Sequence, residues 1–570
     1  MSTPSSYHTA LEADTTGISS PIESTSDLPS SPRYRGAVQP PHTLKSHCQI
    51  HLEEELYLPA LHILDSLLTA GTTIHQTKYG STPARIASPA QLALISTLTV
   101  HPKYTSRTPE GARYSNHEIA TRAIAYLRGV LNLTGPVNAN FRTAFSFVSA
   151  SSAALTRSGR DRDSRWRSSR VSTPSDDSAS DSSDYLDGIL ANEQSVWRRG
   201  TDFWAVLGWA FKCAAMHPER WRHWKGWIEF MVDVLERDWD ERVALDEGEE
   251  DGKMQLGSLL MGYLDDLRNE RKHVLKEVLR ALMAHTDDDP SDKAVYKEVW
   301  EKELVVGVRK TKRKREESVV DLENGKFGDY LDWDADDIGS SEEEDAREGS
   351  PIPRRATGKG GRKPKAKAPE VRVTDGMVDT VPLRQRIFRL LSAAADAFPD
   401  LVFDVVDLYD RFTDRVRRLP LPLLRAFIES HSTHLPTFVQ VELLRRLADA
   451  FLPDKHPDPD VVDPESSGGL TMLMLKECYL PFAAGRVFAD DNARLSLVLE
   501  NMLWFISVHG GMAGGGEELR RAVEKGIKAR EDKIRKRTTS KDAADKPARE
   551  MLARSTRSLR VFVTVVGSRG

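Results

Sequence analysis

The stretch NEQSVWRRGTDFWAVLGWAFKCAAMHPERWRHWKGWIEFMVDVLERDW, residues 192–239, holds seven of the chain's eleven tryptophans. Its apolar residues recur every three or four positions, which is typical of amphipathic helices. Pro218 suits the first turn of a helix and disfavours helical geometry at His217, so two helices are predicted to meet there. The expected inward faces carry Phe203, Leu207, Ala210 and Ala214 in the first helix and Trp221, Trp224, Ile228, Met231, Leu235 and Trp239 in the second.

We interpret this helical hairpin as the packing centre of the folded part of the chain. The alternative is a groove for a partner, because aromatic-rich surfaces form binding hot spots. The tryptophans concerned are Trp197, Trp204, Trp209, Trp221, Trp224, Trp227 and Trp239. The cations beside them, which either stack on the rings or form a charged rim, are Arg198, Arg199, Arg220, Arg222 and Lys225.

The composition indicates folded blocks diluted by segments that do not fold. With 570 residues the chain has room for two or more domains, but only 39% of its residues are apolar and 29% are charged. Its cysteines, Cys48, Cys213 and Cys478, are far apart, which argues against a disulfide framework and fits a reducing compartment. We see no secretory-signal layout and no apolar run of about 18 residues, so no membrane span is expected.

Helical patterns follow one another at short spacing, with almost no strand signal. They cover about 52–68, 88–100, 115–133, 138–155, 253–268, 270–285, 291–306, 383–398, 400–418, 420–431, 436–452, 471–483, 485–509 and 516–537. The sequence therefore predicts an all-α fold, an irregular helical-repeat-like solenoid or bundle with long disordered, charged insertions. No fixed period is present, and only residues 558–567 (SLRVFVTVVG) suggest an added strand.

Composition divides the chain into seven predicted segments. They are a disordered N-terminal arm (1–50), a first part of a helical block (51–155), a disordered Arg/Asp/Ser insertion (156–185), a second part with the hairpin (186–306), a disordered basic–acidic–basic hinge (307–378), a C-terminal helical block (379–537) and a basic flexible tail (538–570). Segments this poor in apolar residues bury too little surface to offset the entropy of ordering. Whether the two helical blocks pack together is left open.

The expected hinge carries two basic clusters around an acidic stretch. The acidic stretch, Asp329 to Glu348, has ten acidic residues against one arginine. The first basic cluster consists of Arg309, Lys310, Lys312, Arg313, Lys314 and Arg315. An extended lysine and arginine string fits the acidic groove of an import carrier, so we expect a nuclear-localisation signal and a nuclear protein.

The second basic cluster lies at residues 353–367. Within it, Gly361, Arg362, Lys363, Pro364 and Lys365 resemble an AT-hook, in which an arginine–proline segment lies in the minor groove of A·T-rich DNA. The usual core is Gly-Arg-Pro, whereas Lys363 intervenes in this chain. The resemblance implies DNA contact, with non-specific phosphate attraction favoured over base readout.

Four hydroxyl residues are candidate phosphorylation sites. Ser340 and Ser341 precede four consecutive acidic residues, and Ser350 and Thr173 each precede a proline. Phosphate at these positions would deepen the acidic block and could order it against the basic clusters.

Evidence for catalytic chemistry is weaker. His47, Cys48 and His51 lack a fourth zinc ligand at a useful spacing. No glycine-rich phosphate loop, nucleophile elbow or paired-carboxylate motif stands out, so we expect no catalytic residue, no metal and no cofactor.

These features together predict a nuclear, non-enzymatic helical scaffold of a chromatin or DNA-maintenance complex. Its expected partners are other proteins of that complex, and DNA or RNA through the basic clusters, with no membrane and no small-molecule substrate. A first alternative is a nucleolar or ribosome-assembly adaptor that uses the same clusters on RNA. A second is a metal-independent helical nuclease, because Arg268 with His273 and Arg425 with His431 have the arginine-to-histidine spacing of helical RNase dimers.

Overall fold

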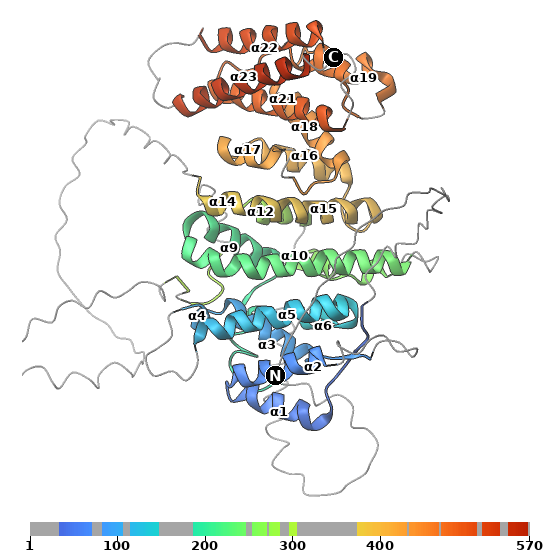
Figure 1. Cartoon of the computed structure of the whole chain (residues 1–570), viewed down its shortest axis with the longest axis vertical. Coiled ribbons are helices and arrows are strands. Elements are labelled where there is room, and N and C mark those ends of the chain that lie inside the picture. The colour runs from blue at the N-terminus through green and yellow to red at the C-terminus, as the bar shows by residue number, and fades with distance from the viewer. Residues whose placement is uncertain are drawn as a thin grey trace, which may run out of the picture.

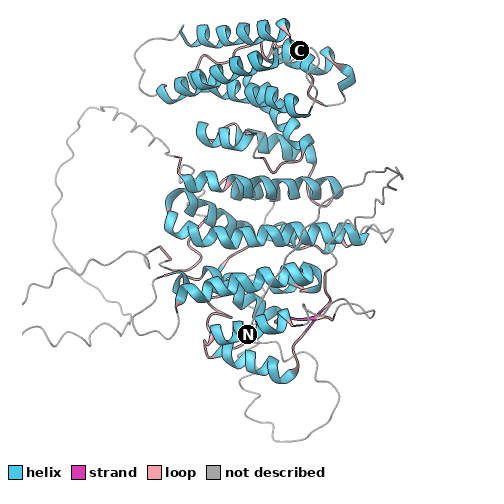
Figure 2. Ribbon diagram, viewed as in Figure 1, coloured by secondary structure: helices cyan, strands magenta, loops and turns pink. Residues whose placement is uncertain are grey.

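The computed structural model is an elongated stack of helical layers, with the N-terminal part of the chain at one end and the C-terminal part at the other (Figure 1). It describes residues 34–70, 82–106, 115–147, 186–246, 254–270, 273–284, 296–301, 303–304, 373–429, 433–466, 469–509, 516–535 and 545–567. Nearly all of the regular structure is helical (Figure 2). The predicted all-α fold of stacked helices is therefore confirmed. None of the described helices is long and apolar enough to span a bilayer.

The first layers surround α3 (Pro89–Val100), a helix that is buried on almost every side. Ser88 caps it, and the backbone N–H of Ser88 donates to the side chain of Gln91 at 3.1 Å. The parallel strands β1 (Ala37–Val38) and β2 (Ala84–Arg85) form the two-stranded sheet of the described residues. The other helices of these layers are α1 (His42–Glu53), α2 (Tyr57–Thr69), α4 (Pro102–Thr105), α5 (Asn116–Asn138) and α6 (Phe141–Ala144).

The tryptophan-rich stretch forms the predicted hairpin. After the short helix α8 (Val196–Arg199), α9 (Phe203–Met216) begins behind an Asp202 cap whose side chain accepts from Ala205 N at 2.7 Å. His217 leaves helical geometry, and α10 (Pro218–Asp246) starts at Pro218. The predicted faces of both helices are buried. The elements η2 (Gln255–Gly257), α11 (Leu259–Glu270) and α12 (Val274–Leu282) follow the hairpin.

The second half of the chain adds further helical layers above the hairpin (Figure 1). Its central helix is α21 (Ala489–His509), which packs against helices on several sides and is buried along most of its length. The other elements are α14 (Asp375–Asp379), α15 (Val381–Ala397), α16 (Val405–Val416), α17 (Leu421–Ile428), α18 (Thr437–Phe451), α19 (Pro459–Val462), η4 (Pro464–Ser466), α20 (Met472–Met474), η5 (Leu475–Tyr479), α22 (Glu517–Arg535) and α23 (Lys546–Gly567).

Helix α15 joins the two halves through a fully buried arginine. Arg384 donates to the backbone carbonyl oxygens of Leu282 and Ala284, just beyond the end of α12, and its guanidinium lies 4.3 Å from the ring centre of Phe211 on α9. The last carbonyls of a helix have no partner within that helix. Arg384 therefore supplies hydrogen-bond donors to carbonyl groups that α12 itself leaves unpaired. It does so from a helix that follows residues 307–378 in the sequence.

A second set of contacts joins α15 to α10. Arg386 donates to both carboxylate oxygens of Glu236 and to Asp233 at 2.6 Å, and Arg389 donates to Glu236 at 2.9 Å. Since α15 packs against α10 and is hydrogen-bonded to the end of α12, the parts of the fold on either side of residues 307–378 are in direct contact. The interpretation of residues 307–378 as a hinge stays a prediction, although the helices that flank this segment are in contact. We call residues 305–372 the charged tract.

The folded region extends further toward both ends of the chain than the sequence predicted. Residues 34–50, assigned to a disordered arm, contain β1 and most of α1, whose Cys48 and Leu52 are buried. Residues 545–567, assigned to a flexible tail with an added strand, form α23, which packs on α21 and α22. In α23 the buried residues Ala548, Leu552, Leu559 and Val563 follow a helical spacing that its many arginines conceal in the sequence.

Two of the predicted helices are only partly described. Of the helix expected at 138–155, the described residues contain α6, while residues 148–155 lie outside them; the described residues of 291–306 form bends and turns. Residues 291–295, where this helix was expected to begin, lie outside the described residues. The carboxylate of Glu303 accepts from the backbone N–H groups of Val299 and Trp300, so a side chain takes the place of helical partners there.

Candidate functional site: the base of the charged tract

All seven tryptophans of the hairpin region are buried, so their rings fill the core and line no accessible groove. Their indole N–H groups are mostly paired inside the protein. Trp204 donates to the Tyr263 carbonyl at 3.1 Å, and Trp227 donates to Ser96 Oγ at 2.9 Å. Trp221 Nε1 differs from these, because it is buried and has no partner among the described residues.

Glu303 is a buried carboxylate at the centre of this cluster. It accepts from the indole N–H of Trp224 at 2.8 Å and from that of Trp209 at 3.2 Å. Its second oxygen accepts from the backbone N–H of Val299 at 3.1 Å. Arg220 completes the shell with a charge-assisted hydrogen bond. A buried carboxylate needs such partners, and Glu303 finds them on α9, on α10 and in its own turn.

Arg220 connects the same cluster to the first layers. Its guanidinium donates to Thr105 Oγ1 at 2.9 Å and to the backbone carbonyl of Val100. It also lies 5.3 Å from the ring centre of Trp224 and 5.7 Å from that of Trp300. Arg220 therefore stacks on tryptophan faces, one of the two arrangements expected for the cations of this region.

The other cations of the hairpin lie closer to the surface. Lys225 pairs with Asp379 at 3.0 Å, and Arg199 donates to the Val299 carbonyl at 3.2 Å. Arg198 and Arg222 are exposed. Of the five cations, Arg220 is the one that is buried.

His101 lies beside this cluster at the start of α4. Its Nδ1 accepts from Lys103 N at 3.2 Å, and its ring meets Trp300 edge-on with ring centres 5.1 Å apart. Burial, together with the nearby charges of Arg220 and Lys103, lowers the pKa of His101 to about 4. The imidazole is therefore neutral near pH 7, as its acceptor role requires.

The segment that precedes the tract rests on a glycine of α9. Tyr296 is buried against Gly208, where an added Cβ would lie 2.2 Å from the tyrosine ring. Such a close approach requires glycine. This contact and the Glu303 hydrogen bonds hold residues 296–304 on α9 and α10.

The segment that follows the tract rests on the same hairpin. Thr374 Oγ1 donates to the Ala214 carbonyl near the end of α9 at 3.0 Å. At Gly376 an added Cβ would lie 2.5 Å from that carbonyl oxygen, so α14 too makes a close approach that requires glycine. Met377 is buried, and the ion pair between Asp379 and Lys225 adds a contact to α10.

We call residues 296–304 and 373–379 together the tract root. Both parts contact α9 and α10 near the turn at His217, although about 70 residues of sequence lie between them. The charged tract therefore leaves and re-enters the fold on one hairpin. Among the described residues, the tract root is the part of the fold that connects the core to the candidate sites predicted within the charged tract.

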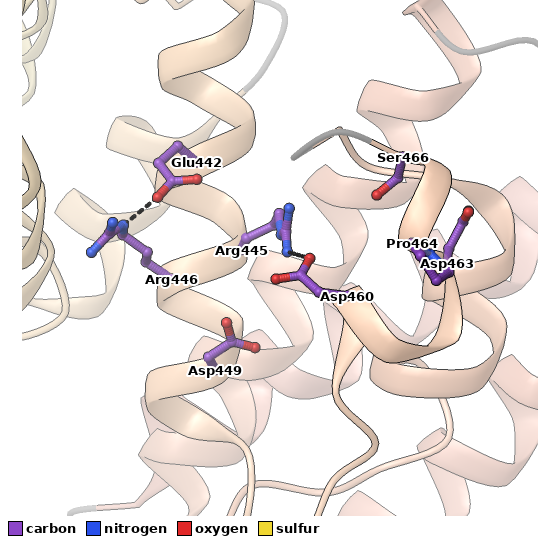
Figure 3. Close-up of a pocket in the computed structure, with 8 residues that line it drawn as sticks. All are labelled: Glu442, Arg445, Arg446, Asp449, Asp460, Asp463, Pro464 and Ser466. Carbon is purple, nitrogen blue, oxygen red and sulfur yellow. Dashed lines mark hydrogen bonds and ion pairs between the residues drawn. The ribbon is translucent and has the colours of Figure 1, made fainter.

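Figure 3 shows a different kind of site, an open pocket of about 570 Å³ between α18 and the segment of α19 and η4. Its lining residues are Glu442, Arg445, Arg446, Asp449, Asp460, Asp463, Pro464 and Ser466. Arg445 donates to Asp460 at 2.7 Å, and Arg446 donates to Glu442.

The other two carboxylates of this pocket are also occupied. Asp449 lies 3.3 Å from His456 Nε2, and Asp463 accepts from Thr471 Oγ1 at 2.7 Å. Burial raises the pKa of Asp449. Because every carboxylate in the pocket has a partner, we interpret it as an ion-pair network that ties α19 to α18.

Most of the sequence-derived site residues lie outside the described residues. This holds for the basic cluster from Arg309 to Arg315, for the AT-hook-like residues Gly361 to Lys365 and for Thr173, Ser340, Ser341 and Ser350. Cys48 is fully buried, and the described residues contain no group of three or more His, Cys, Asp or Glu side chains that could hold a metal ion.

The residues of the nuclease alternative are only partly described. His431 and the side chain of Arg268 lie outside the described residues. His273 occupies the N-cap position of α12 without a side-chain capping hydrogen bond, and Arg425 pairs with Glu429 at 3.1 Å. Sequence reasoning missed Glu303, because a single glutamate in a charged stretch gives no signal that it will be buried.

A comparison with known proteins found no matching family model, no similar curated protein and no similar solved structure.

Proposed function

We propose that the protein is a nuclear, non-enzymatic scaffold that assembles partner proteins of a chromatin or DNA-maintenance complex on a continuous helical stack. In this proposal the charged tract is displayed from the stack as a tethered loop. Its basic clusters direct the protein to the nucleus and add weak nucleic-acid affinity. Its serines are targets for phosphorylation.

The observation that supports this proposal best is the tract root. An insertion needs no specific anchors if it serves only as a spacer. Here the two ends are held by a buried carboxylate that accepts from two indoles, a guanidinium and a backbone N–H, by two close glycine contacts and by a surface ion pair. Such anchoring fixes where the tract leaves the stack, which would place its basic clusters at a defined position relative to bound partners.

The extended helical stack supports the protein-binding part of the proposal. Stacked helices expose a long surface relative to their core and commonly bind other proteins. Because architecture alone does not name a partner, the test must identify partners without assuming them.

The test is affinity purification of the full-length protein from nuclear extract, with and without nuclease treatment, followed by mass spectrometry. A set of partners that survives nuclease treatment would support a protein scaffold. Partners that are mainly ribosome-assembly factors and disappear with ribonuclease would favour the RNA adaptor. If no partner is retained under either condition, the scaffold proposal fails.

A further inference from the structure

The far end of the stack, formed by α22 and α23, carries a second concentration of positive charge. Helix α23 has five basic residues against one acidic residue. The two helices lie next to each other, and α22 and α23 run in opposite directions (Figure 1). This surface belongs to the described fold and is separate in sequence from the basic clusters of the tract.

Several cations of this helix pair already have carboxylate partners. Arg520 and Arg521 both pair with Glu517, and Arg560 pairs with Glu524 at 2.8 Å. Arg535 lies within 4.0 Å of Glu531 and of Asp532. Most carboxylates of α22 are therefore already paired with arginines of the same two helices.

Several exposed cations differ from these. Lys525, Lys528, Arg554 and Arg557 are exposed and have no carboxylate partner among the described residues, and the last three of them concern the face described next. The ion pair between Glu524 and Arg560 sets the register of the two helices. Lys528 lies one turn after Glu524, and Arg557 lies one turn before Arg560, so the antiparallel pair brings Lys528 and Arg557 close together.

Arg554 lies one further turn along α23. With Arg557, Ser558 and Val561 it lines an open hollow of about 550 Å³. Ser558 is partly exposed there. Two exposed arginines and a partly exposed serine thus line the hollow, and the register of the two helices places the exposed Lys528 beside Arg557.

We propose that this face, defined by Lys528, Arg554, Arg557 and Ser558, binds the phosphate backbone of double-stranded DNA. Guanidinium groups match phosphate oxygens in a two-pronged geometry, and serine hydroxyls commonly donate to backbone phosphates. The choice of DNA over double-stranded RNA rests on the proposed function.

The same surface is less suited to other partners. Single-stranded nucleic acids bind through exposed aromatic rings, and Phe562, the aromatic residue of α22 and α23, is half-buried. A tight protein interface would normally use a buried aromatic anchor, which this face does not offer among its described residues. Binding to a regular array of phosphates, in contrast, requires only cations held at fixed positions.

The test compares two triple variants of the full-length protein in which the tract's basic clusters are replaced by glutamine. The first, K528Q/R554Q/R557Q, removes the unpaired cations of this face. The second, R520Q/R521Q/R535Q, removes the same number of charges from the same region, but from cations with carboxylate partners. Binding to a short DNA duplex of mixed sequence is measured by fluorescence anisotropy at several salt concentrations, and circular dichroism checks that both variants fold.

We expect the first variant to weaken binding and to reduce the slope of log affinity against log salt by about 0.9 for each lost phosphate contact. The second variant should leave that slope nearly unchanged. Equal losses in both variants would show that only net charge matters and would overturn the proposal. No loss in the first variant, or tighter binding to a matched RNA duplex, would overturn it as well.

An acidic protein partner would give another result: the first variant would lose partners in the nuclease-treated purification while its DNA affinity stayed the same. That outcome also overturns the proposal. The scaffold function is judged separately, by whether nuclease-resistant partners exist at all. A protein without such partners whose salt slope still depends on Lys528, Arg554 and Arg557 would refute the scaffold and support the DNA surface.

Discussion

Arg220 and Glu303 lie 83 positions apart in the sequence and form an ion pair that is almost completely removed from water, with side chains 7% and 0% exposed. One charge comes from the first turn of α10 and the other from the turn that precedes the charged tract. A buried charge without its partner is strongly unfavourable. A stable hairpin therefore requires that the turn before the tract stay attached to α10, because Glu303 in that turn is the partner of the buried Arg220.

Replacing Glu303 with glutamine should test this dependence. The substitution keeps the shape but leaves Arg220 as an uncompensated buried charge, so we expect the free energy of unfolding to fall by about 3–5 kcal/mol. Urea denaturation followed by tryptophan fluorescence measures the change. Glu301→Gln is the matched control, because that side chain is 89% exposed and its loss should change stability by less than about 0.5 kcal/mol. Similar small effects of both substitutions would contradict the structural role of Glu303.

A second prediction concerns the glycine under Tyr296. Gly208→Ala places a methyl group 2.2 Å from the tyrosine ring, so overpacking should destabilise the protein by about 1–3 kcal/mol. We also expect faster hydrogen exchange in residues 296–304. Gly226→Ala on α10 is the control, since an added Cβ there meets nothing within 4 Å. Helix propensity should make that variant more stable by about 0.5–1 kcal/mol.

A third prediction separates an insertion from a hinge. If a protease site is introduced within residues 340–350 and cleaved after folding, the two fragments should remain together, because α15 is bound to α10 and α12. Size-exclusion chromatography under non-denaturing conditions should give one peak that contains both fragments. Separate elution would show that the contacts of Arg384 and Arg386 do not hold the halves together. The variant R384M/R386E, cut at the same site, should separate more readily.

The nuclear expectation rests on sequence and can be tested directly. Replacing all six cations from Arg309 to Arg315 with alanine should shift a fluorescent fusion from the nucleus to the cytoplasm, because the carrier groove requires a contiguous positive string. The control removes five arginines from the predicted insertion at 156–185: Arg160, Arg162, Arg165, Arg167 and Arg170. These are interrupted by serine and aspartate, so that variant should stay nuclear. Loss of nuclear signal in both variants would argue against a specific import signal.

The sequence was sufficient for the fold class and for the hairpin because both depend on local patterns. The spacing of Phe203 and Leu207 and the break at His217-Pro218 are both short-range signals. The same reasoning failed for α23, where arginines on the exposed face outweigh a narrow buried stripe. It failed again at 296–304, where tertiary partners of Glu303 override a helical pattern.

The tract root was inaccessible to sequence reasoning for a physical reason. Its contacts join residues that are far apart in the chain, such as Trp224 with Glu303 and Ala214 with Thr374. Neither periodicity nor composition encodes such pairs. Gly208 and Gly376 are also inconspicuous in the sequence, since their role depends on which neighbour approaches them. The sequence predicted that tryptophans fill a core, but not that this core holds both ends of the tract.

The last prediction concerns pH and His101. Its folded pKa is about 4, below the ordinary value of 6.5, so between these values the unfolded chain binds a proton that the folded protein does not. The free energy of unfolding should therefore fall as pH decreases from about 6.5 to about 4, with no further change from this group at lower pH. His101→Asn keeps an acceptor for Lys103 N but cannot be protonated, so it should lose less stability over that range. Urea midpoints of both proteins, measured from pH 7 to pH 4, provide the comparison.

His223, whose pKa is also lowered to about 4 by burial and neighbouring cations, is present in both proteins and does not affect the difference. Parallel pH profiles would mean that His101 can accept a proton without leaving its place beside Arg220 and Trp300.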